Sequence, residues 1–228
     1  FFELSLAISA WKQAGDSVWA LRCNPSSGNL HPTEGYVAIP PLEGIHSKPG
    51  VYHYAPKIHA LERRTEFSED VWAELLPMAL PGAFLAGLTS IYWREAWKYG
   101  ERAFRYCQHD VGHALGACRI AAATLGWNMV LLEDVDDLNI ARLFGIGREE
   151  DFHNAERERP ELVCAIFQGS EPRLNLETID KISKGNWMGT ANRLSEEEVV
   201  WDAIDEVCEA TSKQEAKVKY DPPMGNGT

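Results

Sequence analysis

The 228-residue sequence lacks features that would point to several classes of protein. Its five cysteines form no CxxC pair and are odd in number, so reduced thiols in the cytoplasm fit better than a disulfide framework. Its 22 basic residues are outnumbered by 34 acidic ones, which leaves a net charge of −12. Because an acidic surface repels phosphate backbones, we expect no nucleic-acid partner.

Long hydrophobic runs are also missing. The longest stretch without charge covers residues 75–93, just enough to span a bilayer, but it contains Pro77, Pro81, Gly82 and Gly87. A buried wall or lid segment is therefore a better interpretation than a membrane helix, and we expect no membrane association. No secretory signal is visible, and because the chain begins with Phe1 we expect natural residues upstream of it.

Several motifs of catalysis and nucleotide binding are absent as well. There is no GxGxxG, no P-loop and no GxSxG, which excludes a Rossmann fingerprint, a Walker-type loop and a hydrolase elbow. His109 and His113 could share one helix face and one metal ion, but no HExxH and no second ligand cluster accompany them. We predict no metal centre; hydrogen-bonded histidines are the favoured interpretation, and a small metal-binding regulatory domain is the weaker alternative.

Hydrophobic periodicity predicts an α+β fold. We expect helices over residues 2–14, 68–79, 109–126, 136–144 and 196–212, and strands over residues 35–40, 50–55, 127–132 and 162–167. Residues 149–161 and 170–195 are expected to be mostly loop. Between residues 111 and 126 only Arg119 is charged, so that helix is apolar nearly all round. This favours a long central helix in a subunit interface, where Gly112 and Gly116 would permit close approach.

Two segments carry candidate chemistry. The loop at residues 24–29, NPSSGN, offers hydroxyls, an amide and unhindered backbone, which suit a polar heterocycle or a phosphate. An ordinary polar turn is the alternative. A basic stripe of Arg94, Lys98, Arg102 and Arg105 follows one helix face among aromatic residues, which indicates an anionic, flat ligand. The alternative for this stripe is a solvated face paired with acidic neighbours.

These segments resemble motifs of the nitroreductase superfamily, most closely its SagB-type and thiazole/oxazole-forming dehydrogenase branch. The run RCNPSSGNLHPTE at residues 22–34 is similar to the family's PS(S/A)-x-N-x-x-P segment. WKYGERAFRY at residues 97–106 resembles the branch signature, and DVGHA at residues 110–114 looks like the start of its central helix. The resemblance spans about residues 2–169, with the motifs in the expected order.

The resemblance implies a flavoprotein fold in which a mixed sheet is packed by helices. It implies an FMN-dependent oxidoreductase that transfers hydride through flavin N5, with NAD(P)H as the electron donor where a nicotinamide is used. A homodimer or a fused pair of domains would bind the flavin, and the substrate would be a small molecule or a peptide. The flavin-contacting loop carries over to Pro25, Ser26, Ser27 and Asn29. The Lys-Tyr pair implicated in proton removal carries over to Lys98 and Tyr99.

The chain also departs from the family pattern. The Arg-Ser-x-Arg phosphate clamp is not found in this chain, and we expect either that it lies upstream of Phe1 or that Arg22 or Arg173 substitutes in part. Arg102 of the basic stripe is expected to help retain the flavin. Residues 1–169 are expected to form the FMN-binding domain. Residues 170–228 are expected to form an extension or linker with one acidic helix and a Pro/Gly tail. A non-catalytic flavin-binding or interaction domain of the same fold remains the alternative function.

Overall fold

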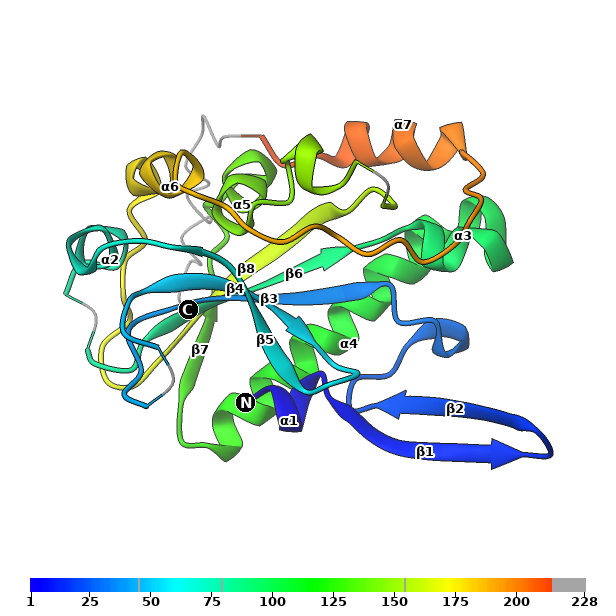
Figure 1. Cartoon of the computed structure of the whole chain (residues 1–228), viewed down its shortest axis with the longest axis horizontal. Helices are drawn as coiled ribbons and strands as arrows, with labels where there is room; N and C mark the ends of the chain where they lie inside the picture. The colour runs from blue at the N-terminus through cyan, green and yellow to red at the C-terminus, as the bar shows by residue number, and fades with distance from the viewer. Residues whose placement is uncertain (45, 79, 154, 215–228) are drawn as a thin grey trace, which may run out of the picture.

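A computed structural model describes residues 1–44, 46–78, 80–153 and 155–214 of the chain. Its centre is a six-stranded sheet with the strand order β5-β4-β3-β6-β8-β7, and β1 and β2 form a separate two-stranded sheet (Figure 1). The α+β class and the long helix are confirmed, although the pairings described in the sheet are all antiparallel rather than mixed. The strands are β1 (Ile8–Ala14), β2 (Ser17–Arg22), β3 (Thr33–Ile39), β4 (Gly50–Ala55), β5 (Ala60–Glu66), β6 (Phe84–Ser90), β7 (Asn128–Leu131) and β8 (Arg159–Phe167).

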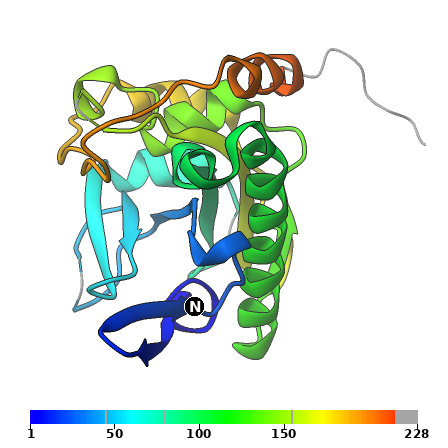
Figure 2. The same cartoon turned by 90° about the vertical axis from the view of Figure 1, so that its right-hand side faces the viewer.

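Helices cover both faces of the six-stranded sheet (Figure 2). They are α1 (Phe2–Ser5), α2 (Glu69–Leu75), α3 (Trp93–Tyr99), α4 (Ala103–Thr124), α5 (Asp137–Phe144), α6 (Leu176–Ser183) and α7 (Asp202–Thr211). Alternate residues of β3 point to opposite faces: Val37 packs with Ala122 of α4, whereas Tyr36 packs in the larger core with Leu143 of α5 and Ile179 of α6. The central strands are therefore buried on both sides, which explains why the uncharged stretch around β6 forms an inner wall.

Local signals in the sequence explain the ends of α5. Asp136 caps it by accepting a 2.8 Å hydrogen bond from the backbone N–H of Asn139. Gly145 ends it in the left-handed conformation with φ of 71°. Phe144, the last helical residue, lies across Gly87 of β6, where any β carbon would clash with its ring. The strand thus needs glycine where the helix approaches most closely.

One expected element is wrong, and one segment predicted as mostly loop contains a helix. The helix predicted over residues 2–14 stops after α1, and the chain then forms the β1–β2 hairpin, whose turn contains Gly15 with φ of 58°. Part of the loop predicted over residues 170–195 is helix α6, which Asn175 caps by accepting from the N–H of Glu177. Ile179 and Ile182 of α6 are buried in the main core, so the helix is stabilised by packing.

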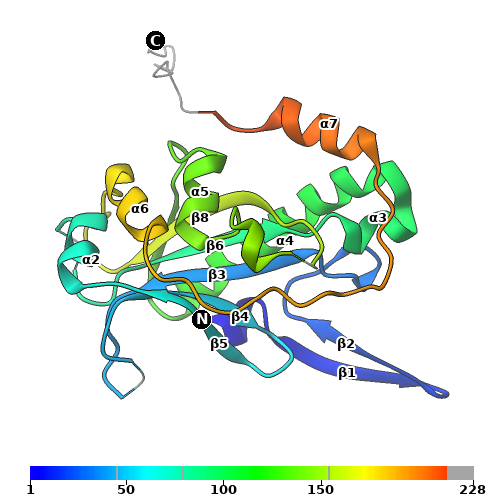
Figure 3. The ribbon, with the colours of Figure 1, turned by 45° about the horizontal axis from the view of Figure 1, so that its top comes forward.

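The C-terminal part of the chain crosses the molecule as an extended strap, residues 186–201. It begins at the outer strand β5, where the Met188 N–H donates to the carbonyl of Arg64 at 2.8 Å, and it ends beside α3 before α7 starts (Figure 3). The division at residue 169 stays a prediction, and the tail at residues 215–228 lies outside the described residues. Among the helices that are described, none is both long and apolar enough to cross a membrane.

Candidate functional site

The two candidate segments of the sequence meet in space. Helix α3 ends at Tyr99 because Gly100 adopts φ of 60° and ψ of −141°, which breaks the helix before α4. Lys98 Nζ and the Tyr99 hydroxyl both reach Gly28: a β carbon built there would lie 3.0 Å from Lys98 Nζ and closer still to the Tyr99 oxygen. Both side chains thus converge on the loop from the last turn of α3, although neighbouring side chains on a regular helix diverge by about 100°.

Hydrogen bonds to Asp110 of α4 hold the loop at residues 24–29. The fully buried Asp110 carboxylate accepts from Ser26 Oγ at 2.6 Å, from Ser27 Oγ at 3.1 Å and from the Ser27 N–H at 2.9 Å. Ser26 Oγ in turn accepts from the backbone N–H of His31 at 2.8 Å. The serine hydroxyls therefore fix the shape of the loop. The sequence marked Asp110 only as part of a helix motif, and its role was missed.

The backbone of this loop is strained. Asn29 and His31 have φ of 60° and 52°, values that non-glycine residues rarely adopt, and Gly28 has φ of 59°. The Asn29 amide holds this conformation, because Nδ2 donates to the carbonyl of Ala20 at 2.8 Å and Oδ1 lies 2.9 Å from His31 Nε2. Strain that the surroundings overdetermine in this way is typical of functional loops.

A cluster of charged side chains lies next to the loop, with the buried Glu34 at its centre. Arg94 pairs with the buried carboxylate of Glu34 and donates to the carbonyl of His31 at 2.9 Å. His53 Nε2 lies 2.6 Å from the same carboxylate. Burial raises the pKa of Glu34, but Arg94 and the His53 hydrogen bond outweigh it and lower that pKa to about 2. For His53, burial lowers the pKa and the hydrogen bond with Glu34 outweighs it, which raises the pKa to about 9.

The basic residues of the sequence prediction divide into two groups. Arg94 is engaged by Glu34, and the half-buried Arg22 has Nη1 3.4 Å from the carbonyl of Thr33, so both belong to the internal cluster. Lys98, Arg102, Arg105 and Arg173 form the second group, and all four are exposed. The uncharged Pro25 of the loop is exposed as well. Only the exposed group presents charge to a ligand in solvent.

A second buried acid lies between α3 and α4. Glu95 is fully buried, and within the described residues neither carboxylate oxygen has a hydrogen-bond partner. Burial, and to a smaller extent the charge of Asp110, raises the pKa of Glu95 to about 8. A neutral acid therefore lies behind the loop near neutral pH. No sequence signal singled it out from other helical glutamates.

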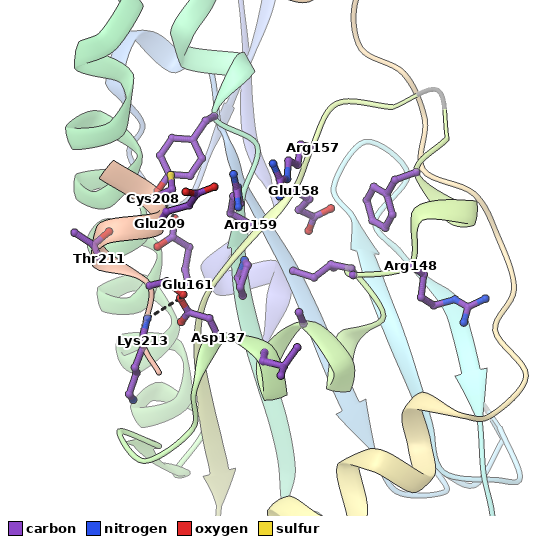
Figure 4. Close-up of a pocket in the computed structure, with 18 of the residues that line it drawn as sticks. Asp137, Arg148, Arg157, Glu158, Arg159, Glu161, Cys208, Glu209, Thr211 and Lys213 are labelled. Carbon is purple, nitrogen blue, oxygen red and sulfur yellow. Dashed lines mark hydrogen bonds between the residues drawn. The ribbon is translucent and has the colours of Figure 1, made fainter. Parts of the chain in front are cut away.

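A cavity of about 1250 Å³ lies between α5, β8 and α7 (Figure 4). Charged residues including Arg157, Glu158, Arg159 and Glu161 line it, but none of the predicted site residues does. Burial, with help from the charge of Glu34, raises the pKa of Glu158 to about 7. We place the candidate site at Gly28 instead, because the motif residues converge there. His109 and His113 are exposed, and the described residues contain no group of three or more His, Cys, Asp or Glu side chains that could hold a metal ion.

Comparisons with known proteins agree on one family. The model described as "Nitroreductase family" matches residues 13–153. A candidate nitroreductase of Methanocaldococcus jannaschii is 32% identical over 128 residues, which cover 54% of this chain and 63% of that protein. The chain thus spans less than two thirds of the length of this relative.

Solved structures show the same fold at lower identity. A candidate nitroreductase from Anabaena variabilis superposes with a TM-score of 0.63 at 22% identity, over 95% of this chain and 42% of that one. The E. coli microcin synthetase complex McbBCD, solved with truncated pro-MccB17 bound, gives 0.53 at 20% identity, over 74% of this chain and 62% of that one.

Proposed function

The chain belongs to the nitroreductase family, and on this premise we propose that it is an FMN-dependent oxidoreductase. The observation that supports the proposal most directly is the convergence of Lys98 and Tyr99 on Gly28. A cation, a hydroxyl and an accessible backbone at one point are groups that can hydrogen bond to a flavin ring. When bound, FMN would supply a hydride acceptor or donor at N5.

Each residue then has a defined share in the reaction. Lys98 Nζ holds or removes a proton at the substrate, and the Tyr99 hydroxyl relays it. Asp110 keeps Ser26 and Ser27 in the loop conformation that Gly28 needs. The exposed guanidinium of Arg102 is our candidate for pairing with the flavin phosphate, in place of the missing clamp.

We propose a homodimer through the exposed face of α4. Gly112 and Gly116 lie on that face with nothing within 4 Å of an added β carbon, and Ile120 is 70% exposed. A flat strip of small residues next to an exposed isoleucine suits close packing against a second helix. Gly116→Leu should therefore give monomers or insoluble protein, whereas wild-type protein that sediments as a monomer would contradict the proposal.

We also propose membership of the SagB-type branch and a cytoplasmic location, with a small molecule or a peptide as substrate. The support for this branch is the WKYGER run around Lys98 and Tyr99. The E. coli microcin synthetase complex was solved with truncated pro-MccB17 bound, and we therefore include a peptide among the substrates to test here. NAD(P)H is the electron donor to test first.

A non-catalytic flavin-binding domain is the second candidate. It is favoured by one observation: the side chains of Ser26, Ser27 and Asn29 are all engaged in hydrogen bonds within the chain. In such a protein the fold would persist, but the flavin would turn over no substrate.

One preparation tests both candidates. Purified protein should be yellow, and heat should release a pigment that behaves as FMN. Lys98→Ala and Tyr99→Phe should keep the flavin but slow its reduction by a proton-donating substrate by about 10²–10⁴-fold, the usual effect of losing a general base. A colourless protein that does not take up added FMN would contradict the proposal. Flavin that no tested donor reduces would favour the non-catalytic candidate.

A further inference from the structure

A smaller cavity of about 510 Å³ lies beside α3, next to the candidate site. We propose that it binds an uncharged aromatic group of the substrate, and this inference rests on the function proposed above. Its size falls within the range of about 300–1000 Å³ that is usual for ligand pockets. Its lining consists of Leu30, Trp93, Arg94, Trp97, Leu194 and Ser195.

The walls of this cavity are aromatic and aliphatic. Trp93 and Trp97 are four residues apart on α3 and therefore lie on the same side of the helix. Trp97 is 59% exposed, so much of its indole is left to contact a ligand. Leu30 of the loop and Leu194 of the strap complete the apolar lining. Covering these side chains with a flat ring would remove apolar surface from water, which is favourable.

The side chains of Arg94 and Ser195 in the lining already have partners. Arg94 pairs with Glu34 and donates to the carbonyl of His31. Ser195 Oγ accepts from Trp93 Nε1 at 2.6 Å and donates to Glu156 at 3.1 Å. A charged ligand would have to give up its hydration without gaining a free counter-charge here, so an uncharged ring is the better fit.

Hydrogen bonds to Glu156 hold the part of the strap that lines the cavity. The buried Glu156 carboxylate accepts from the backbone N–H groups of Leu194 at 2.9 Å and Ser195 at 2.8 Å. Both strap residues and Glu156 lie beyond residues 13–153, the part of the chain that the family model matches. The cavity is therefore built by joining an additional C-terminal segment to helix α3 of the family core.

Two residues that line the cavity are sequence neighbours of candidate-site residues. Trp97 immediately precedes Lys98, and Leu30 immediately follows Asn29. Because neighbouring side chains on a helix diverge by about 100°, a ring seated on Trp97 lies to one side of Lys98 rather than over it. The cavity can thus anchor one part of a substrate while another part reaches Lys98 and Tyr99.

Ligand-observed NMR tests the proposal directly on the full chain. Benzyl alcohol, benzylamine and benzoate share one ring and differ in charge at pH 7. We expect saturation transfer to be strongest for benzyl alcohol. Trp97→Ala should weaken its binding about tenfold or more, which corresponds to about 1.4 kcal/mol or more, because a buried Trp anchor is often a hot spot of binding. Trp11→Ala is the matched control, because Trp11 is 60% exposed on β1 and should have no effect.

Three outcomes would overturn the proposal: no binding of benzyl alcohol, equal binding of the three probes, or equal loss in Trp97→Ala and Trp11→Ala. Because the probes are redox-inert, the result does not depend on flavin content, which is measured separately by absorbance. If the protein contains flavin and Trp97→Ala leaves probe binding unchanged, the proposal for the cavity is refuted and the proposed function is not. Probe binding that Trp97→Ala abolishes, in a protein that takes up no flavin, would support the cavity and refute the proposed function.

Discussion

Ser26 Oγ donates a 2.6 Å hydrogen bond to Asp110 Oδ2 across 84 positions of the sequence. This contact joins the loop before β3 to the buried face of the long helix α4. The same carboxylate also accepts from both the hydroxyl and the backbone N–H of Ser27. The conformation of the loop therefore depends on Asp110, although Asp110 is not among the residues predicted to contact a flavin or a substrate.

We predict that Asp110→Asn destabilises the protein and loosens the loop. An amide can replace only some of the acceptor sites, so at least one buried donor loses its partner, at a cost of about 1–3 kcal/mol. Urea unfolding measures this loss of stability. His109→Asn, an exposed neighbour on α4, is the control and should change stability little. Comparable losses in both variants would contradict the role assigned to Asp110.

Replacement of Gly28 by Ala tests the contact with Lys98 and Tyr99. Gly28 and Gly15 have nearly the same φ, 59° and 58°, but nothing lies within 4 Å of a β carbon at Gly15. Both alanine variants thus have the same backbone strain of about 1–2 kcal/mol from the left-handed conformation. Only in Gly28→Ala does the new β carbon also clash with two side chains. We expect Gly28→Ala to unfold at a lower urea concentration than Gly15→Ala.

A second substitution identifies the cause of that difference. In the Tyr99→Ala background the closest obstacle to a β carbon at Gly28 is gone, so the extra cost of Gly28→Ala should shrink. An unchanged cost, or equal unfolding of the Gly28 and Gly15 variants, would mean that the two side chains move aside freely.

Local signals predicted part of this structure well. The helix predicted over residues 136–144 is α5, which begins after the capping Asp136 and ends at Gly145. The helix predicted over residues 2–14 failed because a helical stripe of apolar residues is only a local pattern. Trp11 is 60% exposed, so this stripe covers no core, and pairing with β2 takes over.

The candidate site was predicted in outline but not in its supports. Sequence motifs identified Lys98, Tyr99 and the serine loop, because these residues are close together along the chain. The contacts of Ser26 with Asp110 and of Glu34 with Arg94 join residues 84 and 60 positions apart, respectively. Such pairs depend on how α3 and α4 pack against the loop and β3, which periodicity in one sequence cannot specify. Helix α6 did carry a local signal, a capping Asn175 before Leu176, Ile179 and Ile182, that was overlooked.

Glu95 gives stability a dependence on pH. Its pKa is about 8 in the folded protein against an ordinary value of 4.5, so the folded state binds the proton more tightly than the unfolded state. The stabilisation that comes from protonated Glu95 is therefore fully present below pH 4.5 and is lost as the pH rises to about 8. Relative to Glu95→Gln, the wild type should lose up to about 1.4 kcal/mol per pH unit within this window.

Urea unfolding of both proteins at pH 5, 7 and 9 measures the effect. The difference between them matters, because other groups such as Glu158 also titrate in the folded state. Glu101→Gln, an exposed residue in the turn after α3, is the control and should follow the wild type at every pH. A constant difference between wild type and Glu95→Gln would show that Glu95 is already ionised in the folded protein.

The pair of Arg94 and Glu34 should be far more important for stability than an ion pair on the surface. The two side chains are only 17% and 6% exposed, whereas those of Lys181 and Glu74, which also pair, are 57% and 48% exposed. Arg94→Ala leaves a buried carboxylate and the His31 carbonyl without this donor, so we expect a loss of about 3–5 kcal/mol. Lys181→Ala should cost less than about 1 kcal/mol. Adding Glu34→Gln to Arg94→Ala should recover part of the loss, because the amide removes the unpaired charge. Equal costs for Arg94→Ala and Lys181→Ala in urea unfolding would mean that His53 and Arg22 alone suffice to hold Glu34.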